Sequence, residues 1–445
     1  MNFEMHMKPP TYNHSFNLNK KPQNSKDNLN ISNINNMNNT QKSHWDYFQY
    51  NINQVNSLQL FNSFAPSEKY FDSLDKELTN YLLVTNSNIS LLKNIQEQHM
   101  KKLETFLHEK LSNNYEIKFG HYGSFFTELN IEGSDLDILI YYKKMKEDCD
   151  LLKDILTILK EYTPEFEIIK PILTASVPVI KLQIDIKNEI KDLKLKQTSY
   201  LEEDDLNKIK IDLTFTENEK DFQNSNETVI YIKNSLQEFS QIKPILQILK
   251  RYFKIMGMNK SYTGGLCSYS LFLLVLSFCK CNKQCLSPTK LLYYFMENFT
   301  YFDYCNYCID VKSENCYILK EKDNVKIDLN IEKSISEENS SFDTNYDLYE
   351  KEEIFIVDPI NSNNVSKSSF RVDEIILTFR KGFNLLYYEG WYYDCFNGNN
   401  NSNENNRIIE NINELYEEDD PSGYMTIKKL FKLKALMNSF DFYFN

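Results

Sequence analysis

Apolar residues follow different periodicities along successive parts of the chain. Residues 1 to about 64 are dominated by Asn, Ser, Lys and Gln and hold few clustered apolar residues. Such a segment cannot bury enough apolar surface to offset the entropy lost on ordering, so a disordered extension is predicted there. After it, the apolar spacing is helical, then alternating, then helical again.

Two helices are predicted before the alternating region, the first around Tyr70–Leu83. The second is clearer, because residues three or four positions apart share one face of a helix. Its face consists of Ile95, His99, Leu103, Phe106, Leu107 and Leu111. From Thr228 onward the pattern is again mostly helical and includes the apolar segment Tyr269–Phe278, which implies a second, α-rich domain.

Short runs rich in β-branched and aromatic residues predict strands between the two helical regions. They are Glu116–Phe119, Asp135–Tyr142, Val177–Leu182 and Lys208–Phe215. The last run alternates most clearly, because its odd-numbered residues are apolar and fall on one face, leaving Asp212 on the other. The charged segment Asp185–Asn207 shows no clear core face, so a surface insertion is predicted there.

Three aspartates point to the chemistry. Asp135 and Asp137 lie two positions apart on a predicted strand, so both carboxylates project to the same side. Asp212, on the polar face of another predicted strand, supplies a third carboxylate. Clustered carboxylates repel one another unless cations compensate them, and Mg²⁺ prefers carboxylate and phosphate oxygens. The sequence therefore predicts that these residues hold two Mg²⁺ or Mn²⁺ ions.

A Gly-Ser dipeptide precedes the aspartate pair, with ten residues between Ser124 and Asp135. Gly123 allows close backbone approach, and a hydroxyl with backbone N–H groups at a helix start can hold a triphosphate. Either motif alone is common, because acidic pairs are more often solvated turns and Gly-Ser pairs are frequent. Their combination with Asp212 predicts a nucleotidyltransferase active site.

The charge balance qualifies this prediction. The formal net charge is −13, whereas nucleic-acid binding usually relies on a basic surface. Acidic residues concentrate in Leu201–Asp205, Ser334–Glu353 and Glu414–Asp420, whereas Gln241–Lys260 carries five basic residues and no acidic ones. A locally basic surface is therefore compatible with the acidic total.

Membrane and secreted classes find no support in the sequence. The longest apolar run, Leu271–Phe278, is far below the roughly 18 to 20 residues that cross a bilayer. The first residues lack the pattern of a signal or import peptide. Nine dispersed cysteines predict reduced thiols, with a zinc site around Cys305 and Cys308 as the minor alternative.

Together the motifs resemble the DNA polymerase β-like nucleotidyltransferase superfamily, and specifically its Trf/Cid branch of poly(A) RNA polymerases and terminal uridylyltransferases. The resemblance covers most of residues 68–395. Besides the Gly-Ser and aspartate motifs, it includes VPVIKL at Val177–Leu182, TGGLCSYSLFLLVLSF at Thr263–Phe278 and IFIVDPINSNNVSKSSF at Ile354–Phe370. It implies an α+β fold in which a palm of mixed sheet and flanking helices is followed by a mostly helical central, PAP-associated domain, with a cleft between them.

The implied domain bounds follow from the same resemblance. The palm covers residues 65–225, with the insertion at about 185–207, and the helical domain covers residues 226–395, with a second insertion at about 325–350. Residues 396–445 form an acidic low-complexity linker and a basic C-terminal segment. On its charges alone, that basic segment is more readily a solvated helix face than an RNA contact.

The family's nucleotide-binding motifs fall on ten residues of this chain. They are Gly123, Ser124, Asn224, Lys250, Lys254, Ser268, Tyr269, Asp358, Asn363 and Asn364. The resemblance implies that Lys250 and Ser268 contact the triphosphate, that Tyr269 stacks on the incoming base, and that Lys254 adds a second cation for the pyrophosphate. Without it, Tyr269 would be interpreted as a core aromatic and Lys250 as a solvated helix charge.

Four further residues concern the ribose and the base. Asn224 falls at the position of a ribose-contacting Asn, although Asn226 competes for that assignment. Asp358, Asn363 and Asn364 would lie near the base edge in a loop that departs from the family pattern. The absence of His from this loop favours ATP as the substrate. Lys254 points to UTP instead, because a second lysine one helical turn after Lys250 is similar to the uridylyl branch.

The resemblance implies a template-independent enzyme that adds AMP from ATP to RNA 3′ ends and releases pyrophosphate, in RNA processing or surveillance. Terminal uridylyl transfer is the close alternative, and a catalytically inactive RNA-binding scaffold is the distant one. An exosome-linked RNA-binding cofactor is the expected partner, because no RRM, KH or zinc-knuckle pattern is present. The nucleus is the expected compartment, with the cytoplasm as the alternative.

Overall fold

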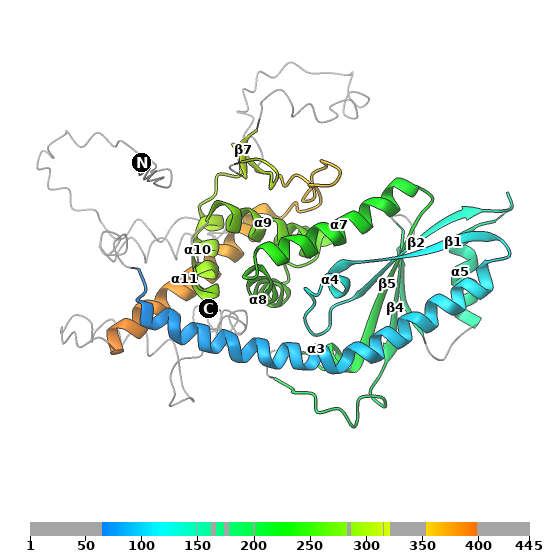
Figure 1. Ribbon diagram of the computed structural model, residues 1–445, viewed down its shortest axis with the longest axis horizontal. Coiled ribbons are helices and arrows are strands. Elements are labelled where there is room, and N and C mark those ends of the chain that lie inside the picture. The colour runs from blue at the N-terminus through cyan, green and yellow to red at the C-terminus, as the bar shows by residue number, and fades with distance from the viewer. Residues whose placement is uncertain are drawn as a thin grey trace, which may run out of the picture. The chain divides into compact units, whose positions relative to one another are not determined.

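The computed structural model describes residues 65–147, 149–161, 166–172, 178–198, 201–282, 286–314, 316–320 and 353–397 (Figure 1). The predicted extension over residues 1–64 and the predicted insertion at about 325–350 lie outside the described residues. So does the C-terminal segment 396–445, apart from its first two residues.

One long helix, α3 (Glu68–Leu111), takes the place of the two predicted helices. The Ser67 hydroxyl caps its start by accepting a hydrogen bond from the Tyr70 amide at 3.3 Å. No Gly or Pro interrupts its 44 residues. The polar middle of the helix includes Thr85 and Asn88, which are fully buried. The predicted break was therefore wrong, because these polar residues face other parts of the protein instead of solvent.

Five strands form one mixed sheet in the order β1-β2-β5-β4-β3. Their bounds are β1 (Tyr115–Tyr122), β2 (Leu136–Lys144), β3 (Glu167–Ile172), β4 (Val179–Asp185) and β5 (Lys208–Thr216). Strands β2 and β5 are parallel, and the other neighbours are antiparallel. The four predicted strands correspond to β1, β2, β4 and β5. The sequence did not predict β3, a mostly exposed edge strand that contains Pro171.

The sheet buries one face under helices. The even-numbered residues of β2 and the odd-numbered residues of β5 form a core with the C-terminal half of α3 and with α5 (Leu151–Glu161). On β5 the predicted alternation is confirmed, because Ile209, Ile211 and Leu213 are all buried. Helix α7 (Glu219–Glu238) contacts β1, β2 and β5, and its Phe222 ring lies 5.6 Å from the Tyr141 ring.

The segment between β4 and β5 corrects a prediction. A surface insertion was expected at about 185–207, but Ile186, Ile190, Leu201 and Leu206 are buried. Within the described part of this segment, Asp204–Asn207 form the one helix, α6. Periodicity did not reveal the buried positions, because apolar residues in irregular backbone have no fixed spacing. The four buried residues anchor the segment to the core of the palm, while most of its other described residues are exposed.

A helical region follows the sheet. It contains α8 (Ile242–Ile255), the short 3₁₀ helix η2 (Ser261–Thr263), α9 (Ser268–Cys281), α10 (Pro288–Thr300) and α11 (Val372–Asn397), with β6 (Tyr307–Ile309) and β7 (Tyr317–Leu319) pairing as a small hairpin. The predicted domain boundary at residues 225 and 226 falls inside α7. Helix α9 is buried on nearly every side, as its continuous apolar run predicts.

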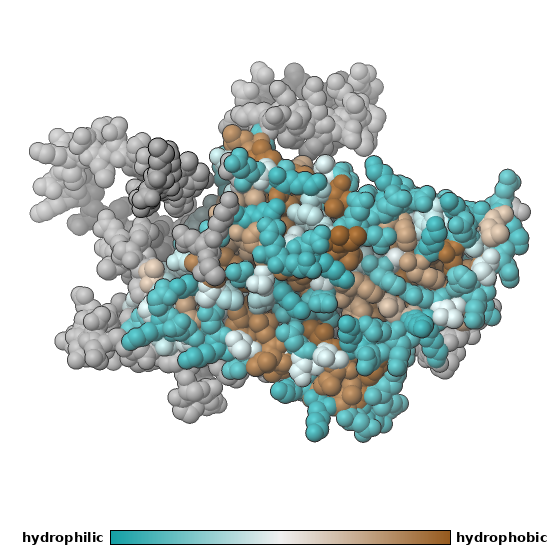
Figure 2. All heavy atoms as spheres, in the orientation of Figure 1, coloured by the Kyte–Doolittle hydropathy of each residue, from teal (hydrophilic) through white to brown (hydrophobic). Residues whose placement is uncertain are grey.

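Helix α3 connects the two regions, since its N-terminal part packs against α10 and α11 and its C-terminal part against β1 (Figure 1). The face drawn in Figure 2 is mostly polar, with separate apolar patches. Within the described residues, no helix has the length and unbroken apolarity needed to span a bilayer. The mixed sheet with flanking helices and the helical region confirm the predicted α+β class.

Replacing Leu206 with Ala tests whether residues 185–207 belong to the core. Leu206 is 4% exposed, so its truncation is expected to lower the free energy of unfolding by about 2–4 kcal/mol in urea denaturation. The control is Lys191→Ala in the same segment, which is exposed and should change stability by less than about 0.5 kcal/mol. Equal, negligible effects of both variants would restore the surface-insertion interpretation.

Candidate active site

The parallel pairing of β2 and β5 brings the three aspartates together. Asp137 and Asp212 are direct register partners on the two strands. Asp135 lies two residues before Asp137, immediately ahead of β2. Successive side chains alternate between the faces of a strand, so the buried Leu136 and Ile138 point into the core while the aspartates point away from it.

The three carboxylates act on one another electrostatically. Burial raises the pKa of Asp137 to about 8, and the negative charges of Asp212 and Asp135 contribute to this shift. Burial and the charge of Asp135 likewise raise the pKa of Asp212. Mutual repulsion of this kind is relieved by a bound cation.

Lys181, on the neighbouring strand β4, is a cation that the sequence analysis missed. It is the register partner of Asp212, and its Nζ contacts Asp212 Oδ2. Burial lowers the pKa of Lys181, but the hydrogen bond to Asp212 and the charge of Asp135 outweigh burial and raise it. A signal was present in the sequence, because Lys181 stands between two apolar residues on an alternating strand.

Lys250, on α8, lies within electrostatic range of the same carboxylates. Burial lowers its pKa to about 8, and the charges of Asp137 and Asp135 oppose this shift. Its Nζ donates a hydrogen bond to the Leu129 carbonyl at 2.9 Å. The structure therefore places Lys250 within electrostatic range of the aspartates and fixes it through the loop that precedes β2.

Gly123 is required by its closeness to Asp137. It has a positive φ of 76°, and a Cβ at this position would lie 1.9 Å from Asp137 Oδ2. Any other residue would displace the carboxylate or the turn. Gly123 and Ser124 begin α4 (Gly123–Phe126), so the structure brings the predicted Gly-Ser turn directly beside the aspartates.

The donor set fits a divalent cation. No three His, Cys, Asp or Glu side chains in the described part of the chain form a ready-made cluster around an ion, including those near Cys305 and Cys308. Mg²⁺ does not require such a cage, because proteins usually bind it through one or two carboxylates together with substrate phosphates and water. Asp135, Asp137 and Asp212 offer oxygen ligands in which negative charge is poorly compensated.

Two predicted base-binding residues meet in the helical region. The Tyr269 hydroxyl donates a hydrogen bond to Asp358 Oδ1 at 3.1 Å, and the Tyr269 ring lies parallel to that of Phe272, 6.3 Å away. Ser268 is exposed at the first residue of α9. The sequence motifs around residues 269 and 358 are thus parts of one spatial site.

The two asparagines of the following loop differ from each other. Asn363 is exposed, and its carbonyl accepts a hydrogen bond from the Asp358 amide at 2.8 Å. The Asn364 side chain is engaged within the loop, where Oδ1 accepts from the Ile356 amide at 3.1 Å and Nδ2 donates to Glu353 at 3.0 Å. Asn364 therefore braces the loop.

In the structure, Asn224 and Lys254 contact other residues of the chain. Asn224 is half-buried on α7, and its carbonyl accepts from the Thr228 hydroxyl at 2.8 Å. Lys254 contacts the buried carboxylate of Asp205. The structure gives Lys254 a partner other than the predicted pyrophosphate.

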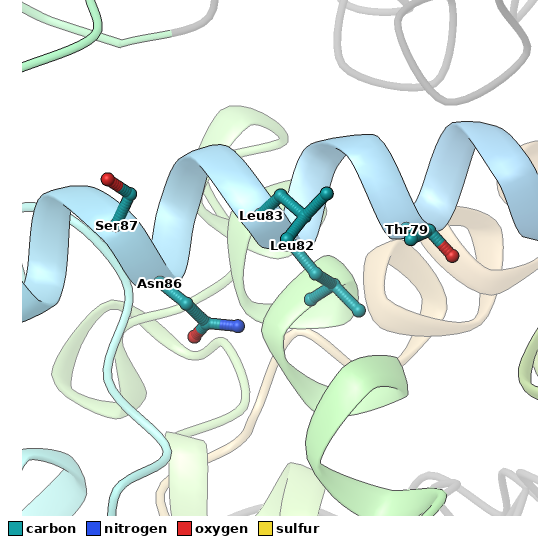
Figure 3. Close-up of a pocket in the computed structure, with 5 residues that line it drawn as sticks. All are labelled: Thr79, Leu82, Leu83, Asn86 and Ser87. Atoms are coloured by element: carbon teal, nitrogen blue, oxygen red, sulfur yellow. The ribbon is translucent and has the colours of Figure 1, made fainter.

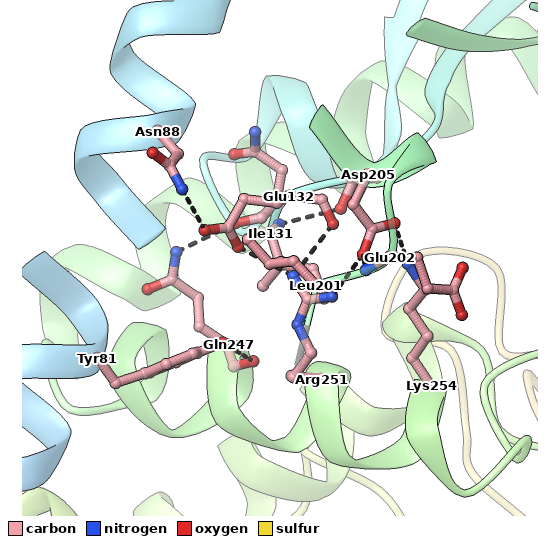
Figure 4. Close-up of polar contacts among 12 residues, drawn as sticks. Tyr81, Asn88, Ile131, Glu132, Leu201, Glu202, Asp205, Gln247, Arg251 and Lys254 are labelled. Atoms are coloured by element: carbon pink, nitrogen blue, oxygen red, sulfur yellow. Dashed lines mark hydrogen bonds and ion pairs between the residues drawn. The ribbon is translucent and has the colours of Figure 1, made fainter. Parts of the chain in front are cut away.

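Lys254 belongs to a buried ion-pair network around Arg251 (Figure 4). Arg251 donates from Nη1 to Asp205 and from Nη2 to Glu132, both at 2.9 Å. The side chains of Arg251, Glu132 and Asp205 are at most 1% exposed. Burial raises the pKa of Asp205, but its pairs with Lys254 and Arg251 outweigh burial and lower it.

The network reaches three other parts of the palm. Asn88 of α3 donates to Glu132 at 3.2 Å and also hydrogen-bonds to the backbone of Lys196. Gly133 has a positive φ of 72°, and a Cβ there would lie 2.1 Å from Asp205. The network therefore joins α8 to α3, to the loop before β2 and to the segment before β5.

A surface hollow elsewhere contains none of the predicted site residues. It lies along α3 and is lined by Thr79, Leu82, Leu83, Asn86 and Ser87 (Figure 3). The chemistry described above does not depend on it.

Comparison with known proteins agrees with this arrangement. Residues 75–233 match the family model described as poly(A) RNA polymerase, mitochondrial-like, central palm domain. The Drosophila melanogaster inactive non-canonical poly(A) RNA polymerase protein Trf4-2 is 25% identical over 211 residues, which cover 45% of this chain and 46% of the relative. Schizosaccharomyces pombe poly(A) RNA polymerase cid14 is 25% identical over 280 residues, 60% of this chain and 34% of the relative.

The chain thus spans less than half the length of these two curated relatives. Among solved structures, the polymerase core of TRAMP, an RNA surveillance complex, aligns with a TM-score of 0.46 and 18% identity, covering 88% of this chain and 96% of that one. The family match and the sheet agree with the predicted polymerase β-like palm.

Neutralising Asp137 is expected to stabilise the metal-free protein. An acid whose pKa is raised from 3.8 to about 8 on folding binds extra protons in the folded state, so stability falls as pH rises through this window. Asp137→Asn should therefore raise Tm by roughly 2–4 °C at pH 8.5 in EDTA, with a smaller difference at pH 5.

Thermal melts with and without Mg²⁺ measure this effect. Mg²⁺ should raise the Tm of the wild type more than that of Asp137→Asn, because a ligand stabilises only the form that binds it. Asp192→Asn, at an exposed carboxylate, should match the wild type under every condition. A lower Tm for Asp137→Asn at pH 8.5 in EDTA would contradict the electrostatic argument.

Removing Arg251 is expected to destabilise the fold strongly. Arg251→Met leaves Glu132 and Asp205 buried without their main partner, which should cost about 3–5 kcal/mol in urea denaturation. The control is Lys243→Met on the same helix, whose Nζ lies 4.0 Å from Glu128 in an exposed pair. That change should cost less than about 1 kcal/mol. Similar losses in both variants would remove the special role of Arg251.

Proposed function

We propose that this chain, whose residues 75–233 match the central palm model of mitochondrial-like poly(A) RNA polymerases, is a template-independent nucleotidyltransferase that adds AMP from ATP to RNA 3′ ends. The observation that carries this proposal is the convergence of Asp135, Asp137 and Asp212 on neighbouring strands, beside the turn at Gly123. Asp135, Asp137 and Asp212 are the proposed catalytic and metal-binding residues.

The proposed reaction joins the RNA 3′-oxygen to the α-phosphorus of ATP and breaks the bond to the β-phosphate, releasing pyrophosphate. Bound divalent cations supply the Lewis acidity that activates the 3′-hydroxyl and neutralises the departing pyrophosphate. The three aspartates would hold two Mg²⁺ or Mn²⁺ ions. Gly123 and Ser124 would border the triphosphate, and Lys250 would supply a positive charge beside it.

The helical region would bind the base and ribose. The Asp358 carboxylate fixes the Tyr269 hydroxyl, so the ring has a defined orientation for stacking on a base. Ser268 and Asn363 are exposed nearby on the same two segments and are available to a nucleotide. Asn224 would contact the ribose from α7.

One observation favours ATP over UTP, and a second removes an argument for UTP. The segment Ile354–Phe370 contains no His, the residue that uridylyl-specific relatives often place there. Lys254, which by resemblance pointed to the uridylyl branch, contacts Asp205 within the buried network. Because Lys254 is paired with Asp205, it gives no evidence for UTP. Uridylyl transfer is the second candidate and is supported by resemblance alone.

A catalytically inactive RNA-binding scaffold is the remaining alternative, since one relative is named as inactive. All three aspartates are present in this chain, which supports activity. We further propose that the protein acts in the nucleus in RNA processing or surveillance, together with an exosome-linked RNA-binding cofactor.

Extension of a labelled oligoribonucleotide with each of the four nucleotides separately tests the proposal. The wild type should extend it with ATP in the presence of Mg²⁺ or Mn²⁺. Asp135→Asn and Asp212→Asn should each lower turnover by at least about 10²–10³-fold, because each removes a main electrostatic stabiliser of the transition state. Asp192→Asn should retain full activity. Preferred incorporation of UTP would select the uridylyl candidate, and equal extension by wild type and aspartate variants would exclude this catalytic site.

A further inference from the structure

Two exposed aromatic rings lie beside one glycine near the aspartates. Tyr262 is 64% exposed in the 3₁₀ helix η2, and Phe370 is 62% exposed just before α11. Large apolar side chains are usually buried, so a pair of such exposed rings from segments about 100 residues apart is notable. Neither ring belongs to the nucleotide site described above.

Gly264 brings the two segments together. It ends η2 with a positive φ of 89°, and a Cβ there would lie 2.7 Å from the Phe370 ring. The Gly264 carbonyl accepts a hydrogen bond from the Arg371 amide at 3.1 Å, and the Gly265 carbonyl accepts from the Ser369 hydroxyl at 2.8 Å. These contacts therefore hold the two segments together, while the rings that they carry are exposed.

Cations accompany the rings. Lys260 Nζ lies 6.0 Å from the centre of the Tyr262 ring, and Arg371 directly follows Phe370. Arg371 also pairs with Glu374, and both side chains are partly exposed. In a chain with a net charge of −13, such local cations matter for attracting a polyanion.

Both rings lie on segments that also carry proposed nucleotide-binding residues. Tyr262 lies between Lys250 of α8 and Ser268 of α9, and Phe370 ends the segment that holds Asp358 and Asn363. An RNA 3′ end that meets the bound nucleotide would approach these segments. Exposed aromatic rings interleaved with cations are the usual surface for single-stranded nucleic acid, because every base has a face that stacks.

We propose that Tyr262 and Phe370 form a stacking platform for the last bases of the single-stranded RNA 3′ end, with Lys260 and Arg371 beside its phosphates. This inference rests on the proposed function, which supplies RNA as the substrate. A protein partner fits the surface less well, because Ser261, Thr263 and Ser368, next to the rings in the sequence, are polar and at least partly exposed, whereas protein interfaces have a continuous apolar centre.

Binding of a 5′-labelled oligoribonucleotide to the full chain, followed by fluorescence anisotropy in EDTA, tests the platform without turnover. Tyr262→Ala and Phe370→Ala should each weaken binding by about 5- to 100-fold, the range expected for loss of one stacked base. Tyr262→Phe and Phe370→Tyr should retain binding, because they keep the rings. Thermal melts of each variant should match the wild type, since both rings are exposed.

Two matched variants control for the loss of an exposed apolar side chain. Tyr301→Ala removes a ring that is also 64% exposed, and Leu319→Ala removes a side chain that is also 62% exposed. Neither should change RNA affinity. RNA with abasic residues at its last two positions tests stacking directly, because it has no bases there to stack. The wild type should bind this RNA weakly, and Tyr262→Ala/Phe370→Ala should lower the affinity for it by little more.

Unchanged RNA affinity of the double variant would overturn the platform and leave the rings to a protein partner. The platform would also be overturned if Tyr262→Ala/Phe370→Ala lost as much affinity for the abasic RNA as for the intact RNA. If the rings bind RNA but no nucleotide is incorporated, the proposed function fails while the platform stands. If the wild type extends RNA and the double variant binds it normally, the function stands and the platform fails.

Discussion

The arrangement of the proposed active site depends on one guanidinium. Arg251 reaches from α8 to two buried carboxylates, and each carboxylate lies on the segment that leads into a strand carrying a proposed catalytic aspartate. Glu132 precedes Asp137 by five residues, and Asp205 precedes Asp212 by seven. The N–H groups of a guanidinium point in fixed directions. By donating from Nη1 and Nη2, Arg251 therefore constrains the two segments relative to each other and to the helical region. Buried ion pairs are rarely a net gain in stability over apolar packing, so this constraint on geometry is a better reason for the network than stability.

The charges of the protein divide into two groups with different partners. Glu132 and Asp205 are matched by Arg251 and Lys254, which gives a network of two negative and two positive side chains. Lys181, Lys250 and Lys260 act on the three aspartates, yet burial and the neighbouring carboxylates still raise the pKa of Asp137 to about 8. The structural carboxylates are thus neutralised within the chain, whereas the ionised form of Asp137 is poorly compensated there and would be stabilised by an external cation.

Sequence patterns predicted the elements in which one face is buried and the other is not. Alternation on β5 isolated Asp212, and the same two-residue period put Asp135 and Asp137 on one side. The patterns failed where tertiary contacts replaced periodicity. The middle of α3 is polar because Asn88 bonds to Glu132 and Lys196, and the segment 185–207 buries Ile186, Ile190, Leu201 and Leu206 from irregular backbone. Alternation marks Lys181 as a polar-face residue, but its pairing with Asp212, like that of Lys254 with Asp205, depends on which strands and helices become neighbours, and no local pattern encodes that.

The segment that would meet the base is fixed by its own side chains. Asn364 holds the loop through Ile356, Ser366 and Glu353, and Asp358 holds both the Ile360 amide and the Tyr269 hydroxyl. Groups engaged in this way keep the loop in one shape whichever nucleotide is present, because breaking them would leave buried polar atoms unpaired. Under the proposed function, base discrimination would therefore rest on exposed groups such as Asn363 and on backbone atoms of the loop, and Asn364 would affect it only by supporting that shape.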